Sequence, residues 1–167
     1  RSMADSLRWF GIDRAKKQAG AWENDIAVVG YKYQMTDIAA GMGLAALDDW
    51  DANISYRKSL FEGYLRLLNG IPGLEVLSKP IENREHAAWL MTVAVEDRKG
   101  LQRKLLENGI EANQVHYRND RYSIFGGRRH DFPVMDSLEP RYLVLPMHTR
   151  MSIEDVVRIS EVISAGW

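Results

Sequence analysis

The segment at residues 30–40, GYKYQMTDIAA, constrains this chain more than any other part of it. It places a polar, aromatic loop with one lysine, Lys32, directly before a helix rich in small residues. Thr36 is a good N-cap because its hydroxyl can accept a hydrogen bond from an orphan backbone N–H. Asp37 then falls in the first turn, where a negative charge suits the helix dipole. The sequence therefore predicts a cationic loop held beside the start of a helix.

Two glycines, Gly41 and Gly43, fall inside that helix. Each costs about 1 kcal/mol relative to alanine in a helix interior, so their presence needs a reason. Close approach of another backbone is the reason we favour, at a contact between subunits. The same letters fit a dinucleotide-binding fingerprint, but that motif requires a strand directly before its glycines. Packing is the better explanation.

Hydrophobic periodicity and turn residues divide the rest of the chain. We predict helices at 3–10, 36–49, 51–69, 97–108 and from 152 onward. One long helix bent near Trp50 is the alternative for the second and third. Strands are predicted at 74–77, 88–95, 110–115 and 142–145, an extended piece at 26–29 within a loop, and a long polar loop at 116–140. This order predicts an α+β fold: a long linking helix followed by a small, mostly antiparallel sheet with helices on one side.

Composition excludes several classes of protein. A chain of 167 residues with 46% hydrophobic content can bury the core of about one domain. The net charge of −1 gives no bias toward nucleic acid or an anionic membrane, and no apolar run of about 18 residues predicts a membrane span. The absence of cysteine excludes disulfides and agrees with a cytoplasmic location. The four histidines lack paired ligand spacing, so no metal site is expected.

The segment at 30–40 resembles the G-x-[NK]-[YF]-x-M-[TS]-[DE]-[IL]-x-A-A pattern of the DegT/DnrJ/EryC1/StrS family. These are fold-type I, pyridoxal-phosphate-dependent aminotransferases that act on nucleotide-linked keto-sugars. Other segments are similar to the family in order and spacing over essentially the whole chain: LRWFGIDR at 7–14, LLENGI at 105–110, FPV at 132–134, LPMH at 145–148 and MS at 151–152.

The resemblance implies three parts of the chain. Residues 1–35 would be a remnant of the large cofactor domain and its loop, 36–69 a linking helix or helices, and 70–167 the C-terminal small domain. The lysine that forms the Schiff base with the cofactor would lie upstream, so no catalytic residue is expected here. The opening at Arg1 reads like the middle of a helix, and we expect a piece of a longer protein that is inactive by itself.

By this resemblance, Lys32 would reach across a homodimer to the phosphate of pyridoxal 5'-phosphate held by the partner subunit. Tyr33 and Gln34 would help to shape the same cofactor site, although Gln34 stands where arginine or asparagine is more usual. An ammonium on a rigid loop at a helix N-terminus suits a phosphate on physical grounds as well. The alternative is a solvated lysine on a surface loop.

Aromatic and guanidinium side chains alternate at 116–126, directly after the strand predicted at 110–115. Guanidinium forks bind diphosphates, and aromatic faces stack on sugars or bases. His116, Arg118 and Tyr122 are therefore predicted to bind substrate, and the resemblance places this loop near the nucleotide-sugar. An ordinary polar loop anchored by its aromatic residues is the alternative.

His148 precedes the last helix in a Leu-Pro-Met-His turn. Its neutral and charged forms are both accessible near pH 7, so it is predicted to bind substrate or to orient a catalytic group. A role in stabilising the turn is equally open.

The resemblance implies transamination: an amino acid, expected to be glutamate, supplies nitrogen to a nucleotide-linked keto-sugar for cell-surface polysaccharide or aminosugar synthesis. Pyridoxal 5'-phosphate is expected in the complete enzyme and not in this piece. Three alternatives stay open: a sugar dehydrase of the same family, in which histidine replaces the upstream lysine, a non-catalytic dimerisation or regulatory module, and a nucleotide- or RNA-binding module. Without the large domain, the helix at 38–47 would expose apolar surface, so we expect self-association through it.

Overall fold

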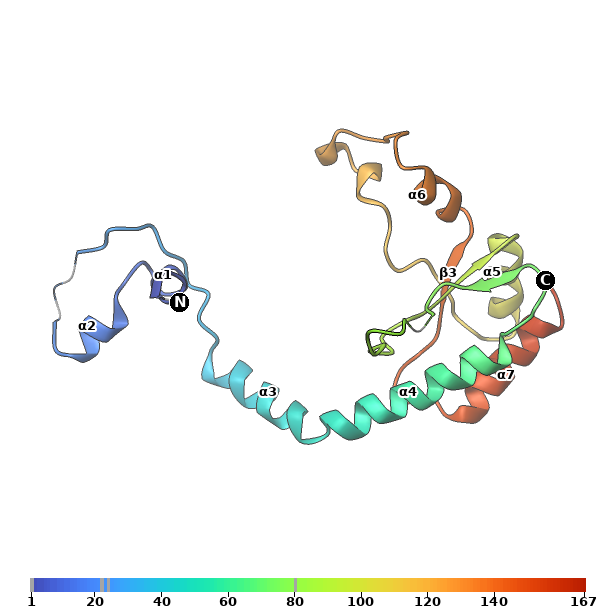
Figure 1. The fold of residues 1–167 in the computed structure, drawn as a ribbon, viewed down its shortest axis with the longest axis horizontal. Coiled ribbons are helices and arrows are strands. Elements are labelled where there is room, and N and C mark those ends of the chain that lie inside the picture. The colour runs from blue at the N-terminus through green and yellow to red at the C-terminus, as the bar shows by residue number, and fades with distance from the viewer. Residues whose placement is uncertain (1, 22, 24, 80) are drawn as a thin grey trace. The chain divides into compact units, whose positions relative to one another are not determined.

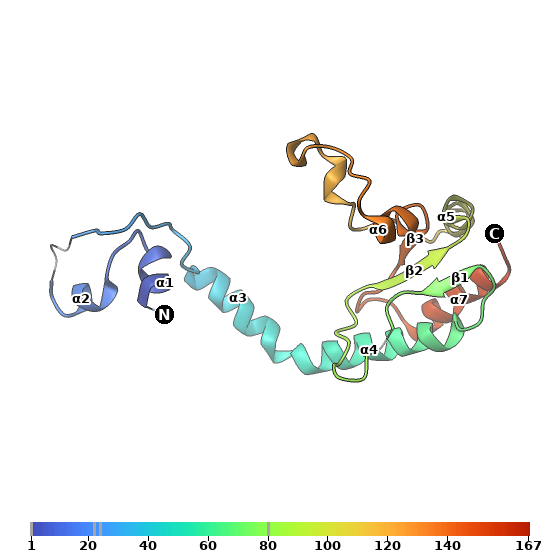
Figure 2. The same ribbon diagram turned by 45° about the horizontal axis from the view of Figure 1, so that its top comes forward.

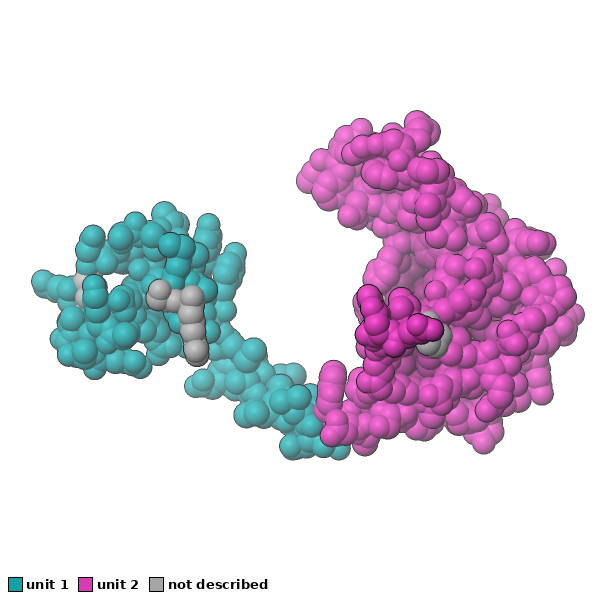
Figure 3. Space-filling view, in the orientation of Figure 1, with its two compact units in different colours: residues 1–49 teal, residues 50–167 magenta. Residues whose placement is uncertain are grey.

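The computed structural model describes residues 2–21, 23, 25–79 and 81–167, and these form two compact units (Figure 3). Unit 1 is Arg1–Asp49 and unit 2 is Trp50–Trp167. The boundary falls where one helix ends at Asp48 and the next begins at Trp50, so the predicted helices at 36–49 and 51–69 are two helices separated by Asp49.

Unit 1 contains the helices α1 (Ser2–Leu7), α2 (Arg14–Gln18) and α3 (Asp37–Asp48) (Figure 1). The second of these was not predicted. The Asp13 side chain accepts a hydrogen bond from the backbone N–H of Lys16, which caps α2 and explains why a helix begins there. The loop predicted around 26–29 is irregular in the structure, and no strand forms over these residues.

The helix α3 begins as predicted. The Thr36 hydroxyl accepts a hydrogen bond from the N–H of Ala39 at 3.3 Å. None of the described residues of α3 is buried, and a Cβ placed at Gly41 or Gly43 would have no described atom within 4 Å. The described part of this chain therefore supplies no backbone close to the two glycines. The large apolar side chains of α3 are all exposed: Ile38, Met42, Leu44 and Leu47.

Unit 2 is built on a three-stranded antiparallel sheet, with strands β1 (Leu74–Val76), β2 (Met91–Val95) and β3 (Tyr142–Leu145) in that order (Figure 2). Leu74 pairs with Val95, and Met91 pairs with Leu145. The predicted α+β fold with a small antiparallel sheet is confirmed.

Four helices accompany the sheet: α4 (Trp50–Leu67), α5 (Arg98–Glu107), α6 (Pro133–Leu138) and α7 (Ile153–Ser164). The helices α4 and α7 pack together and run below the sheet in Figure 2, and α5 contacts both α7 and β2. Asp97 caps α5, and Ser152 forms a capping box with Asp155 at the start of α7. No described helix is long and apolar enough to cross a membrane.

The core of unit 2 lies between one face of the sheet and the helices α4, α5 and α7. Alternation along β2 directs Met91, Val93 and Val95 to the same face. These side chains are fully buried, and each such apolar residue contributes about 1.5–3 kcal/mol through removal from water. They pack with residues of the other elements: Leu60, Phe61, Tyr64, Leu101, Leu105, Leu143, Leu145, Val156 and Ile163.

The strand predicted at 110–115 is wrong, since only Asn113 makes a bridge, to Val144 of β3. The side-chain amide of Gln102 in α5 donates to the carbonyl of Ala112 at 3.0 Å and to the side chain of Asn113 at 2.8 Å. A helix side chain therefore satisfies the carbonyl of Ala112, which a longer strand would pair through a ladder hydrogen bond.

The strand predicted at 88–95 begins late, at Met91. Ala88 has a positive φ of 50°, which interrupts extended backbone. The Arg57 guanidinium, from α4, donates to the carbonyls of Ala88 and Trp89. These carbonyls are therefore satisfied by a helix side chain in place of a neighbouring strand.

Replacement of Tyr64 by Phe is expected to lower the free energy of unfolding by about 1–2 kcal/mol, because it leaves a carbonyl in the core without its donor. The fully buried Tyr64 hydroxyl donates to the carbonyl of Pro146 at 2.8 Å. The matched control is Tyr56→Phe: Tyr56 donates to the carbonyl of Met151 but is 38% exposed, so water can replace it. Urea unfolding of both variants tests this, and equal losses would contradict it.

Candidate functional site

The loop that carries Lys32 is fixed by backbone contacts to the end of α1. The N–H of Phe10 donates to the carbonyl of Tyr31 at 3.0 Å, and the N–H of Tyr33 donates to the carbonyl of Arg8 at 2.9 Å. Lys32 itself forms a bridge with Trp9. These contacts hold the backbone of Lys32 on both sides while its side chain stays exposed.

Two glycines permit this arrangement. Gly11 has a positive φ of 76°, and a Cβ on Gly30 would lie 1.8 Å from the backbone nitrogen of Gly11. No side chain fits between the two segments, so the loop rests directly on the turn that follows α1. Among the described residues, no carboxylate pairs with the Lys32 ammonium. The cation is thus held at its backbone and free at its end.

Tyr33 and Gln34 flank this lysine in different ways. The Tyr33 ring is exposed and stacks on Tyr31, with ring centroids 5.1 Å apart. The half-buried Gln34 accepts a hydrogen bond from Arg14 at 3.1 Å, and the Arg14 guanidinium lies 5.4 Å from the centre of the Trp9 ring. The structure therefore places Lys32, Tyr33 and Gln34 together in unit 1.

The predicted substrate residues all lie in unit 2. His116 is exposed, with its ring centroid 5.5 Å from that of Trp89, an exposed side chain that the sequence analysis did not single out. The Tyr142 hydroxyl of β3 donates to the carbonyl of His116 and ties this point of the loop to the sheet. Tyr122 is exposed at the end of a short 3-10 turn, Asn119–Arg121. His116, Trp89 and Tyr122 thus offer aromatic surface to solvent.

Arg118 is placed differently from the other predicted substrate residues, because its side chain is only 2% exposed. Its guanidinium donates to both oxygens of Asp120, to Asp136 and to the carbonyl of Arg129. The Glu139 carboxylate lies 3.6 Å away. All three guanidinium nitrogens therefore have partners within the loop.

The ion pairs shift the titration of their carboxylates. The Arg118 guanidinium lowers the pKa of Asp120 well below its usual range, mainly through the hydrogen bonds that it donates. It also lowers the pKa of Asp136, again chiefly by hydrogen bonding. The sequence analysis missed both carboxylates, although four arginines and four acidic residues lie close together at 118–139.

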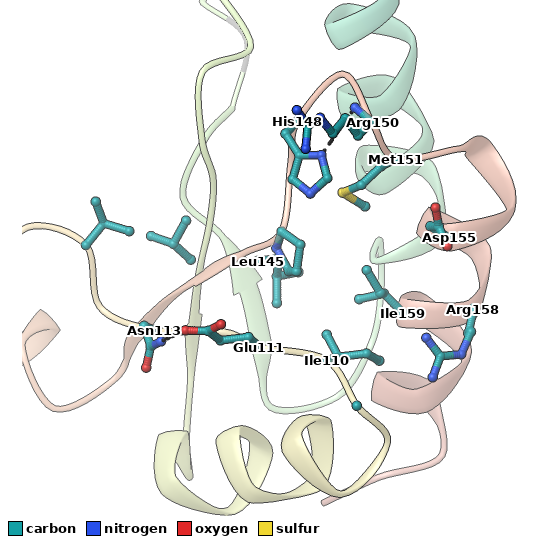
Figure 4. Close-up of a pocket in the computed structure, with 14 residues that line it drawn as sticks. Ile110, Glu111, Asn113, Leu145, His148, Arg150, Met151, Asp155, Arg158 and Ile159 are labelled. Carbon is teal, nitrogen blue, oxygen red and sulfur yellow. Dashed lines mark hydrogen bonds between the residues drawn. The ribbon is translucent and has the colours of Figure 1, made fainter.

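His148 stands at one end of a cavity of about 570 Å³ in unit 2 (Figure 4). Its Nδ1 accepts a hydrogen bond from the backbone N–H of Arg150 at 3.2 Å, which supports the turn-stabilising role. The other side chains of the cavity include Glu111, Asp155 and Arg158. Val115, the neighbour of His116 in sequence, lines the same cavity.

No group of three or more histidine, cysteine or acidic side chains that could hold a metal ion occurs among the described residues. The expected absence of a metal site remains a prediction.

Comparison with known proteins identifies the family. The model of the DegT/DnrJ/EryC1/StrS aminotransferase family matches residues 1–164. The chain belongs to this family. It is 28% identical over 137 residues to a GDP-perosamine synthase of Escherichia coli O157:H7, covering 82% of this chain and 38% of that protein. It is 24% identical over 169 residues to a dTDP-4-amino-4,6-dideoxy-D-glucose transaminase of Escherichia coli, covering 95% of this chain and 45% of the other.

Solved structures share this fold. The sugar aminotransferase CalS13 from Micromonospora echinospora is 30% identical, with a TM-score of 0.88 over 97% of this chain and 43% of that one. AtS13 from Actinomadura melliaura is 34% identical, with a TM-score of 0.89 over 99% of this chain and 44% of that one. The chain therefore spans about two fifths of the length of these relatives.

The Asp120→Asn variant is expected to be less stable than the wild type at pH 7, and this difference should shrink with acid. A carboxyl whose pKa is lowered by folding stabilises the folded state above its unfolded pKa of about 4, and this contribution is lost as the pH falls toward the lower folded value. Thermal unfolding at pH 7, 5, 4 and 3 measures the difference. The exposed Glu107→Gln is the control, and a difference that grows with acid would contradict the expectation.

Proposed function

We propose that this chain is the C-terminal part of a pyridoxal-phosphate-dependent aminotransferase that transfers an amino group from an amino acid to a nucleotide-linked keto-sugar. The match of the family model to residues 1–164 carries the proposal. The names of the two Escherichia coli relatives support an amino-sugar nucleotide as product and favour transamination over dehydration. Glutamate is the proposed donor, and the catalytic lysine would lie in the part of the enzyme that precedes this chain.

Lys32 fits a role in holding the cofactor phosphate. Its ammonium is free of carboxylates among the described residues, and its backbone is fixed by hydrogen bonds on both sides. Phosphate binding by an ammonium needs such an accessible charge at a defined position. Solved structures of the PMP form and the PLP form of Spr1654 from Streptococcus pneumoniae, 27% and 26% identical to this chain, support a pyridoxal cofactor.

Pyridoxal 5'-phosphate, when bound, supplies the electron sink that aminotransferase chemistry needs. Within the complete homodimer, Lys32 would hold the phosphate of the cofactor bound to the partner subunit, and Tyr33 and Gln34 would form part of the wall of that cofactor site. His116 and Tyr122 would contact the nucleotide-sugar through their exposed rings. We retain His148 as a substrate-binding candidate because its ring borders a cavity.

Replacement of Lys32 by Ala in the complete enzyme is expected to weaken pyridoxal 5'-phosphate binding by about tenfold or more, since a charge-assisted hydrogen bond to phosphate contributes about 1.5–3 kcal/mol. Cofactor absorbance during titration measures the affinity. Lys32→Asn, which keeps a donor, should lose less, and Lys16→Ala on α2 is the matched control. Unchanged cofactor affinity in Lys32→Ala would contradict the assignment of this loop to the cofactor phosphate.

The 167-residue chain alone should show no turnover of glutamate and a keto-sugar nucleotide.

A homodimer is part of the proposal, and α3 is the surface that we assign to it. Replacement of Leu44 by Glu should abolish self-association of the chain, because it places a charge in the middle of the exposed apolar surface of α3. Asp48→Lys changes the charge of the same helix without removing apolar surface and should leave association unchanged. Sedimentation at several concentrations decides this, and a monomeric wild-type chain would refute it.

A further inference from the structure

We propose that Arg118 is a positioning residue, which holds the segment at 116–140 in the shape that presents His116 and Tyr122 and does not itself bind substrate. The inference rests on the proposed function, because it concerns the loop assigned to the nucleotide-sugar. It replaces the direct contact that the sequence alone predicts for Arg118.

The first argument is that four of the five guanidinium N–H groups have hydrogen-bond partners, and Nη1, which carries the fifth, lies 3.6 Å from the Glu139 carboxylate. Its Nε and Nη2 grip the two oxygens of Asp120, and its Nη1 donates to Asp136. Nη2 also donates to the carbonyl of Arg129 at 3.2 Å. A substrate phosphate would have to displace these partners from a side chain that is 2% exposed. Breaking a buried pair in this way leaves an uncompensated charge, which is strongly unfavourable.

The second argument is that these bonds join distant points of the segment. Arg118 and Asp120 lie at its start, and Asp136 lies in α6 near its end. The Asp120 carboxylate also accepts the backbone N–H of Arg129 at 3.0 Å, in the middle. A planar fork that reaches two carboxylates and a carbonyl at once thus closes the loop at three places.

The third argument is that apolar packing does not hold the tip of this segment. Ile124 is 84% exposed and Phe125 is 60% exposed. Two short 3-10 turns, Asn119–Arg121 and Ser123–Phe125, are the only regular structure that the described residues form between 116 and 132. The ion pairs of Arg118, together with those of Arg128 to Asp136 and Glu139, are therefore the main restraint on the shape of the tip.

The last argument is the short path from Arg118 to the exposed aromatic side chains. The carbonyl of Arg118 accepts the N–H of Arg121 at 3.3 Å and starts the turn that ends at Tyr122. His116 lies two residues before Arg118, and its carbonyl is held by Tyr142. A change in the Arg118 side chain therefore acts on both substrate candidates through the backbone.

The test uses two variants, Arg118→Lys and Asp120→Asn, with two readouts. Arg118→Lys keeps the positive charge but lacks the planar guanidinium that reaches several partners. Asp120→Asn keeps the arginine but removes the negative charge and one of the two acceptor oxygens of its main partner. Hydrogen exchange of amides at 118–132 in the chain should rise by about tenfold or more in both variants, while amides of β2 stay protected. In the complete enzyme, assayed in the reverse direction with dTDP-4-amino-4,6-dideoxy-D-glucose as amino donor and 2-oxoglutarate as acceptor, both should raise KM for this amino-sugar nucleotide by a similar factor and change kcat less.

Arg129→Lys is the matched control, because the side chain of this arginine of the same loop forms its ion pair with the exposed Asp131 and lies 4.8 Å from the centre of the Phe132 ring. It should leave exchange and KM unchanged. A normal KM in Asp120→Asn together with a raised KM in Arg118→Lys would show direct substrate contact and overturn the proposal. Unchanged exchange, or raised exchange with unchanged KM, would overturn it as well. A complete wild-type enzyme without aminotransferase activity would refute the proposed function, whereas the exchange measurement would still test the ion pairs.

Discussion

Burial of one face of a very small sheet is the constraint on which unit 2 depends. Its strands have three, five and four residues, and such a sheet is not stable in water without a packed face. The helices α4 and α7 cover this face, and α5 packs against β2 and α7. Tyr64 shows how closely the two layers are joined, because it lies in the apolar core and still hydrogen-bonds to the residue after β3. The positions of β2 and β3 follow from this packing. Trp89 lies just before β2, and His148 lies just after β3.

The segment at 116–140 is held by a different kind of interaction. Apolar burial gives a core many interchangeable contacts, whereas one guanidinium with two carboxylates has a single geometry. These ion pairs leave aromatic rings such as Tyr122 exposed, as the proposed contact with a ligand requires. An apolar core beneath the tip would bury these side chains. Stability and accessibility are thereby separated between the sheet and the loop.

Local signals in the sequence predicted much of the fold. Caps at Thr36, Asp97 and Ser152 fixed the starts of three helices, since a side-chain oxygen bonded to a free N–H is decided within four residues. The errors lay where distant contacts decide. The stretch at 110–115 was predicted as a strand, but the carbonyl of Ala112 bonds to the side chain of Gln102 from α5, and only Asn113 pairs with β3. The Asp136 carboxylate beside Arg118 is likewise visible only in the folded loop. The resemblance named the family, whereas it could not supply these partners.

The link between Arg57 and the residues before β2 has a mechanical consequence. The guanidinium projects from α4 and holds the carbonyls of Ala88 and Trp89, just ahead of the first residue of the strand. Trp89 therefore takes its place from a helix on the far side of the core, not from the neighbouring strand. Any small rotation of α4 about its axis would be carried to this indole and to the imidazole of His116 beside it. The helix that starts unit 2 is in this way linked to the aromatic surface formed by Trp89 and His116.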